Sequence, residues 1–154
     1  MTPDEFVQRG NRAHQHGDLV SAGREYRAAL ALAPGHPIAL HNFGLVEYRR
    51  GRIDRAVGLL ERATDVMPGE PEFRHSLGLA LVAADRVDEG IDCYRQVLEQ
   101  RPGHAAAWYN FGVALQQRAR TAEAITAFEN AVRLAPEFAA AREKLESARR
   151  PSSH

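Results

Sequence analysis

The residues best suited to chemistry in this chain of 154 residues are two histidines with equivalent surroundings, His41 and His75. Imidazole can bind a metal ion or exchange a proton near neutral pH. However, two imidazoles without a carboxylate or thiolate beside them fall short of the three or four ligands of a normal metal site. The sequence also lacks a glycine-rich phosphate loop and a nucleophile motif. We therefore expect no metal site, no cofactor and no catalytic residue, and we interpret both histidines as polar surface or ligand-contacting groups.

Asn42 and Asn110 indicate a different chemistry, which is hydrogen bonding to a peptide backbone. They occur in the similar segments His-Asn-Phe-Gly and Tyr-Asn-Phe-Gly. An asparagine amide offers one acceptor and two donors, so it can pair with a backbone amide whatever the neighbouring side chain is. Simple solvation of both amides is the alternative interpretation. The pattern favours binding that selects little for ligand sequence.

Cys93 and an arginine-rich segment have plainer interpretations. A lone Cys93 cannot form an internal disulfide, and beside Tyr94 it is expected to pack as a small apolar residue. Residues 49–52, Arg-Arg-Gly-Arg, together with Arg55 form the densest cationic feature. We interpret it as a solvated turn, with an edge contact to an acidic partner as the alternative.

Composition excludes two classes of partner. The chain has 20 Lys and Arg against 20 Asp and Glu, so its formal charge is zero and it lacks the field on which polyanion binders depend. No apolar run approaches 18 residues, and no apolar leader follows Met1. We expect a soluble, cytoplasmic protein with no nucleic-acid or membrane partner.

A 34-residue period organises the whole chain. Proline and glycine both recur at this interval, at Pro34, Pro68, Pro102 and Pro136 and at Gly10, Gly44, Gly78 and Gly112. This divides the chain into units 3–36, 37–70, 71–104 and 105–138. In each unit the apolar residues follow helical spacing, interrupted once by a polar turn, so each unit is predicted to be a pair of helices. Such short pairs cannot bury their apolar faces alone, and the units must therefore stack.

The recurring glycines lie inside predicted helices, where glycine costs about 1 kcal/mol relative to alanine. Close approach of the second helix in the unit can offset this cost. We expect each glycine to receive a large side chain from that helix, supplied in turn by Tyr26, Leu60, Tyr94 and Phe128.

The fourth unit carries the segment Trp-Tyr-Asn-Phe-Gly-Val-Ala-Leu at 108–115, followed by Ala124, Phe128 and Pro136. This pattern resembles the signature of the tetratricopeptide repeat family. The resemblance implies an all-α fold, an α-solenoid with a right-handed superhelix of four helix-turn-helix repeats. We expect one domain over residues 1–150, with residues 139–149 as a capping helix and residues 151–154 as a disordered tail.

The same resemblance implies that the first helix of each repeat lines a concave groove that binds an extended peptide. Asn42 and Asn110 are similar to the asparagine ladder in the repeats of O-linked N-acetylglucosamine transferases, which Ser76 interrupts here. His41, His75 and Tyr109 would contact ligand side chains. The full set of expected groove residues is Asn11, His41, Asn42, Leu45, His75, Ser76, Leu79, Tyr109, Asn110 and Val113. Because few of these are charged, the partner should be a protein segment that is extended and not strongly acidic.

Tetratricopeptide domains that bind the acidic tails of heat-shock chaperones use a clamp of Lys, Asn, Asn, Lys and Arg across three repeats. Val7, Glu72 and Ser76 occupy places that should be basic in that clamp. Without paired cations nothing can bind two carboxylates, so this chaperone role is not expected.

Two alternatives to a free-standing binding module stay open. The repeats could recruit substrate for a glycosyltransferase or another enzyme, carried on a longer or a separate chain. They could also form a self-associating structural or assembly factor, through the convex face or the solenoid ends. We expect a monomer or weak self-association.

Overall fold

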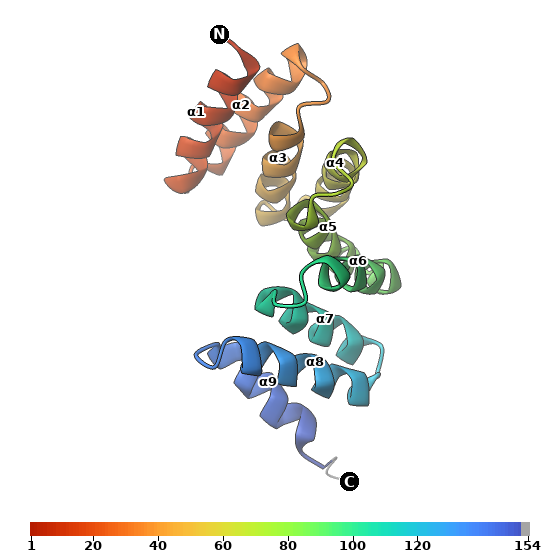
Figure 1. Ribbon diagram of the computed structural model, residues 1–154. Helices are drawn as coiled ribbons and strands as arrows, with labels where there is room; N and C mark the ends of the chain where they lie inside the picture. The colour runs from red at the N-terminus through yellow and green to blue at the C-terminus, as the bar shows by residue number, and fades with distance from the viewer. Residues whose placement is uncertain (152–154) are drawn as a thin grey trace.

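The computed structural model describes residues 1–151, which form nine α-helices and no strand (Figure 1). The helices are α1 (Pro3–Gln15), α2 (Leu19–Leu32), α3 (Pro37–Arg49), α4 (Ile53–Val66), α5 (Pro71–Ala83), α6 (Val87–Gln100), α7 (Ala105–Gln117), α8 (Thr121–Leu134) and α9 (Ala139–Arg149). The predicted solenoid of four helix pairs and a final helix is confirmed. Of the tail predicted at 151–154, residues 152–154 lie outside the described part of the chain.

Local sequence sets the helix ends. Pro37 and Pro71 begin α3 and α5, where the missing N–H costs nothing. Each second helix ends two residues before a recurring proline, as α2 does before Pro34. The turn within each repeat contains one residue with positive φ, and these residues are Gly17, Gly51, Asp85 and Ala119. Glycine tolerates that conformation, so the last two turns are more strained than the first two.

The two helices of each repeat approach closely at the recurring glycine. A Cβ added to Gly112 would lie 2.6 Å from Phe128 Cε1, and one added to Gly44 would lie 2.7 Å from Leu60 Cγ. Gly10 and Gly78 meet Tyr26 and Tyr94 at similarly short distances. The large partners are almost wholly buried. The expected glycine contacts are therefore confirmed in all four repeats.

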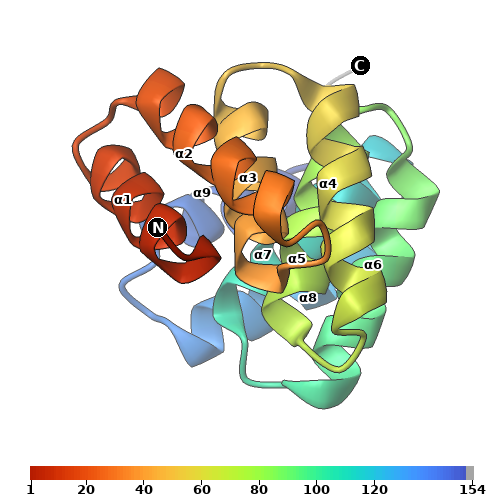
Figure 2. The same cartoon turned by 90° about the horizontal axis from the view of Figure 1, so that it is seen from above.

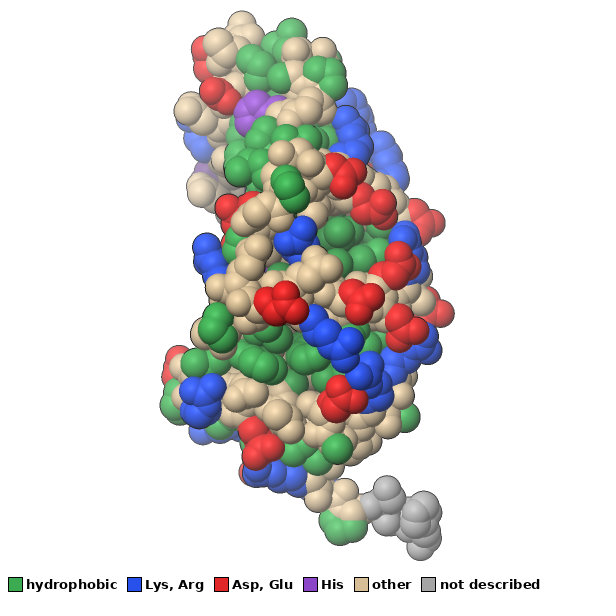
Figure 3. Space-filling view, turned by 45° about the vertical axis from the view of Figure 1, so that its right-hand side comes forward, with side chains coloured by type: hydrophobic (Ala, Val, Ile, Leu, Met, Phe, Trp, Pro, Cys, Tyr) green, Lys and Arg blue, Asp and Glu red, His purple; other side chains and the backbone are tan. Residues whose placement is uncertain are grey.

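The stacking of the pairs gives the solenoid an inner and an outer side. The first helices of successive repeats contact one another, in the pairs α1 with α3, α3 with α5 and α5 with α7. The second helices pack instead against the first helix of the next repeat. First helices therefore line the inside of the curve, with α4 and α6 on its outer side (Figure 2). On the face that carries these outer helices, acidic and basic side chains intermingle (Figure 3).

Helix α9 covers the end of the stack by packing against α8. Its Ala141 and Leu145 are buried, whereas Arg142 and Glu146 remain exposed. The last repeat therefore does not present its apolar side to water. Among the described residues, no helix combines the length and the apolar composition needed to cross a bilayer.

A buried carboxylate stands in the core of the second repeat. Glu47 is fully buried at a position that is leucine in the third and fourth repeats, Leu81 and Leu115. Arg50 lies 3.2 Å from one of its oxygens, and Arg52 and Arg55 each lie 3.5 Å from the other. The arginine-rich segment was expected to be a solvated turn, and Arg52, in the connection between α3 and α4, is exposed, as is Arg55 at the start of α4. The sequence did not predict that Arg50, Arg52 and Arg55 also contact one buried carboxylate. They converge on Glu47 and neutralise its charge.

Replacing the recurring glycine should destabilise the fold. For Gly112→Ala the added methyl group overlaps Phe128, and we expect a net loss of about 1–2 kcal/mol after the gain in helix propensity. Gly58→Ala in α4 is the matched control, because nothing lies within 4 Å of an added Cβ there. The control should gain about 0.5–1 kcal/mol. Urea unfolding followed by circular dichroism measures both, and shifts of the same sign would contradict the close-contact explanation.

The buried Glu47 allows a second test of core packing. Glu47→Ala removes the partner of three arginines and leaves a cavity, so we expect a loss of about 3 kcal/mol. Glu47→Leu restores the residue that Leu81 and Leu115 provide in later repeats and should lie within about 1 kcal/mol of the wild type. The arginines are partly exposed and can rehydrate. Equal losses for the two variants would mean that the carboxylate charge itself is needed.

Candidate functional site

The expected groove residues lie along the inner side of the solenoid, on α1, α3, α5 and α7. All of them are half-buried except Ser76, which is buried. The structure brings the polar members into two hydrogen-bonded networks that cross between repeats. Leu45, Leu79 and Val113 lie one helical turn further on, at equivalent places in three repeats.

The first network is centred on Asn11. Its Oδ1 accepts a 2.6 Å hydrogen bond from the hydroxyl of Tyr26 and a 2.9 Å bond from Nδ2 of Asn42. Burial raises the pKa of Tyr26 to about 12, so its hydroxyl remains a donor at neutral pH. The Asn11 amide therefore joins both helices of the first repeat to the first helix of the second.

His41 extends this network into the third repeat. Its Nδ1 lies 3.0 Å from Asn42 Oδ1, and its Nε2 lies 2.8 Å from the Ser76 hydroxyl. The ring also stacks on Phe73 with centroids 4.5 Å apart. Burial lowers the pKa of His41, so the ring is neutral near pH 7. Nδ1–H then donates to Asn42, and Nε2 accepts from Ser76.

The second network joins the third and fourth repeats. Nδ2 of Asn110 lies 3.1 Å from His75 Nε2, and the amide donates to the imidazole lone pair. Burial, aided by the nearby His104, lowers the pKa of His75 to about 4. Tyr109 is held by aromatic neighbours, with ring centroids 6.0 Å from Phe128 and 4.9 Å from Phe138. The inner surface is thus polar but carries neutral imidazoles.

Two residues that sequence reasoning missed also reach this part of the groove. His104 is the N-cap of α7, and its Nε2 lies 2.8 Å from Glu72 Oε1. The His104 and His75 rings have centroids 4.8 Å apart. The expectation that His75 has no carboxylate beside it is therefore wrong. The repeat period offered one clue to this contact. His36 and Asp4 lie two repeat lengths before His104 and Glu72, so the sequence contains the same pair of residue types twice at equivalent positions.

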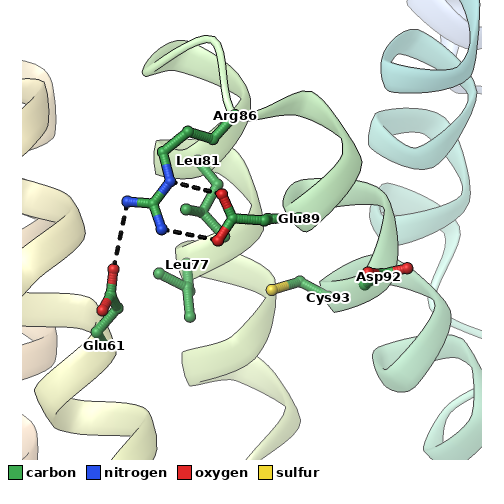
Figure 4. Close-up of a pocket in the computed structure, with 7 residues that line it drawn as sticks. All are labelled: Glu61, Leu77, Leu81, Arg86, Glu89, Asp92 and Cys93. Atoms are coloured by element: carbon green, nitrogen blue, oxygen red, sulfur yellow. Dashed lines mark hydrogen bonds and ion pairs between the residues drawn. The ribbon is translucent and has the colours of Figure 1, made fainter. Parts of the chain in front are cut away.

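A hollow of about 280 Å³ lies on the outer side, between α4, α5 and α6. Figure 4 shows Arg86 between Glu61 and Glu89, with the Cys93 side chain at the edge of the hollow. Arg86 makes a bidentate contact with Glu89 at 2.6 and 2.7 Å and reaches Glu61 at 3.5 Å. Cys93 packs beside the apolar cluster that contains Leu77, so its expected role as a small apolar residue is confirmed.

Comparisons with known proteins agree with this architecture. Two family models described as tetratricopeptide repeat match residues 13–79 and 75–137. A curated relative, tetratricopeptide repeat protein 8 of Caenorhabditis elegans, is 49% identical over 43 residues. That match covers 28% of this chain and only 8% of the relative.

Solved structures are also similar. MamA from Desulfovibrio magneticus superposes with a TM-score of 0.87 at 20% identity, covering 95% of this chain and 82% of MamA. The Cut9-Hcn1 complex of the APC/C superposes at 0.90 with 18% identity, over 97% of this chain and 30% of the other. Both likenesses concern the fold alone. An O-GlcNAc transferase of Thermobaculum terrenum superposes at 0.79 with 29% identity, over 85% of this chain and 26% of the transferase.

The surroundings of Cys93 predict that its thiol reacts slowly with alkylating reagents. Burial raises the pKa of Cys93 to about 11, against about 8.5 for an unfolded cysteine, and only the thiolate reacts rapidly. At pH 8 we expect alkylation by iodoacetamide to be on the order of 100-fold slower in the native chain than in the urea-unfolded chain. The native rate should rise about tenfold per pH unit until the pH approaches 11. Native and unfolded rates within threefold of each other would rule out this account.

Proposed function

Because the chain belongs to the tetratricopeptide repeat family, we propose that it is an interaction module that holds an extended segment of another protein in its concave groove. Repeats of this family form protein-interaction scaffolds and are typically non-catalytic, so we assign no reaction. The proposal treats residues 1–150 as one binding unit in a cytoplasmic protein. The observation that carries it is the row of half-buried amides along the inner side.

The amides keep free hydrogen-bonding capacity after their internal bonds are counted. Asn42 uses one N–H toward Asn11 and its oxygen toward His41, which leaves a second N–H. Asn110 donates one N–H to His75, which leaves its other N–H and its oxygen. The internal bonds hold both side chains in place, so a ligand backbone would meet groups that are already oriented.

Spacing supports an extended ligand. Packed helices lie about 8–10 Å apart, and an extended strand rises about 3.3 Å per residue. A row with one polar group per repeat would therefore meet roughly every third ligand residue. Ser76 is buried and bonded to His41, so the middle of the row has fewer free hydrogen-bonding groups for a ligand.

The chemistry of the groove favours a neutral or mildly apolar segment. Leu45, Leu79 and Val113 provide an apolar floor, and His41 and His75 are neutral near pH 7 because burial lowers their pKa values. The groove therefore lacks the paired cations that an acidic peptide would require. The formal charge of zero also favours a protein partner over a nucleic acid.

Similarity to the O-GlcNAc transferase of Thermobaculum terrenum supports a second candidate, in which these repeats recruit substrate for an enzyme. The chain corresponds to 26% of that transferase. The two candidates share the same groove and differ in what the bound segment is delivered to. If the preferred peptides are glycosylated by a transferase only in the presence of this chain, the second candidate is correct.

The test uses a library of 12-residue peptides of neutral, acidic and basic composition, with affinity measured by fluorescence anisotropy. We expect neutral peptides to bind tightest and the Asn42→Ala/Asn110→Ala variant to bind them on the order of tenfold more weakly, because two backbone hydrogen bonds are lost. Asn130→Ala on α8 is the control, since Asn130 bonds to Arg133 away from the groove. It should bind as the wild type does.

Circular dichroism and thermal unfolding must show that the double variant remains folded, because Asn42 also joins two repeats. Acidic peptides binding tightest would contradict the proposed ligand chemistry. Equal affinity of the wild type and a folded double variant would exclude the amide row as the binding site.

A further inference from the structure

We propose that Glu72, His75 and His104 form a binding site for a divalent transition-metal ion of the zinc class, which joins the third and fourth repeats. One ligand atom from each residue lies within 4.8 Å of the others. Two imidazoles and a carboxylate are a ligand set that zinc uses, with a fourth position left open. This inference does not rest on the proposed peptide binding, although His75 and its neighbour Asn110 also belong to the expected groove.

The fold places the three side chains together for separate reasons. Glu72 and His75 are three residues apart on α5, so they share one face of the helix. His104 comes from the N-terminal end of α7, and its Nε2 already lies 2.8 Å from Glu72 Oε1. Zinc ligands at about 2.0–2.2 Å from the ion lie roughly 3.4 Å apart. Modest side-chain rotation is therefore enough to bring all three to that separation.

The groups that contact His75 and Glu72 can adjust to an ion. Asn110, which contacts His75 Nε2, can present either an N–H or an oxygen and can therefore accommodate either tautomer of the ring. Arg101 lies 4.0 Å from Glu72 Oε1 and has to yield that contact to the ion.

His104 makes the affinity moderate. Its Nδ1 accepts a 3.1 Å hydrogen bond from the backbone N–H of Ala107, so Nε2 carries the proton in the metal-free chain. An ion on Nε2 moves that proton to Nδ1 and removes the cap from Ala107. Three coordination bonds are gained at the cost of the capping bond to Ala107 and of the contacts that His104 and Arg101 make with Glu72. We therefore expect a micromolar Kd.

The first half of the chain contains a natural comparison. His36 caps α3 through Ala39 and lies 2.7 Å from Asp4, two repeat lengths before His104 and Glu72. At the place of His75, however, the first repeat has Val7. Asp4 and His36 therefore offer two metal ligands, whereas the site in the second half of the chain offers three. The chain should therefore bind one ion and not two.

The test titrates the full chain, without a histidine tag, with Zn²⁺ by calorimetry and with Co²⁺ by visible absorption. We expect one ion per chain, with His75→Val and His104→Asn each weakening the affinity at least about 30-fold. His75→Val introduces the residue of the first repeat, and His104→Asn keeps an N-cap side chain. His36→Asn is the matched control and should bind as the wild type does.

Circular dichroism confirms the fold of each variant before titration. No binding by the wild type up to millimolar metal would overturn the proposal. So would unchanged affinity in a folded His75→Val variant, or loss of binding in His36→Asn.

Discussion

The close contact between glycine and one large side chain in each repeat is the constraint on which the rest of the structure depends. At Gly112 and Phe128, as at Gly44 and Leu60, the second helix comes nearer than any side chain would allow. This fixes the distance between the helices of a pair, and it does so four times at the same place. Because the pairs are alike, they stack in the same way, and the inner row of first helices follows from that stacking.

Polar groups are accommodated inside this frame in two different ways. Glu47 is an ion in the core, and three arginines compensate its charge. The groove instead contains neutral amides and imidazoles that bond to one another across repeats, such as Asn11 with Asn42. Neutral partners avoid the desolvation cost of a buried ion and keep spare donors and acceptors. The buried charge in the core is therefore accompanied by residues of opposite charge. The neutral polar groups of the inner side need no such counter-charge.

The fold was predictable because its signals are local and repeated. The 34-residue recurrence of glycine and proline predicted the helix pairs. The large residue that follows each glycine in the second helix, such as Tyr26 after Gly10, predicted how the two helices pack. The same period placed the expected groove residues on the first helix of each repeat, where the structure has them. The contacts of Glu47 were not predictable, because they depend on how the turn at residues 50–52 folds back. The contact of His104 with Glu72 was missed because it joins a helix cap to a helix 32 residues earlier, and only the conformation of the connection at residues 101–104 brings them together.

Packing between neighbours alone has a mechanical consequence. Within residues 1–151, the main contacts of each helix are with the adjacent helix and, on the inner side, with the first helix of the next repeat. Among these residues, no helix from one end of the stack packs substantially against a helix from the other end, and α1 and α9 lie at opposite extremes of the stack (Figure 1). A force applied along the rod is therefore shared among successive interfaces, each of which rotates slightly. The molecule should extend reversibly as a spring does, opening its curve before any repeat unfolds.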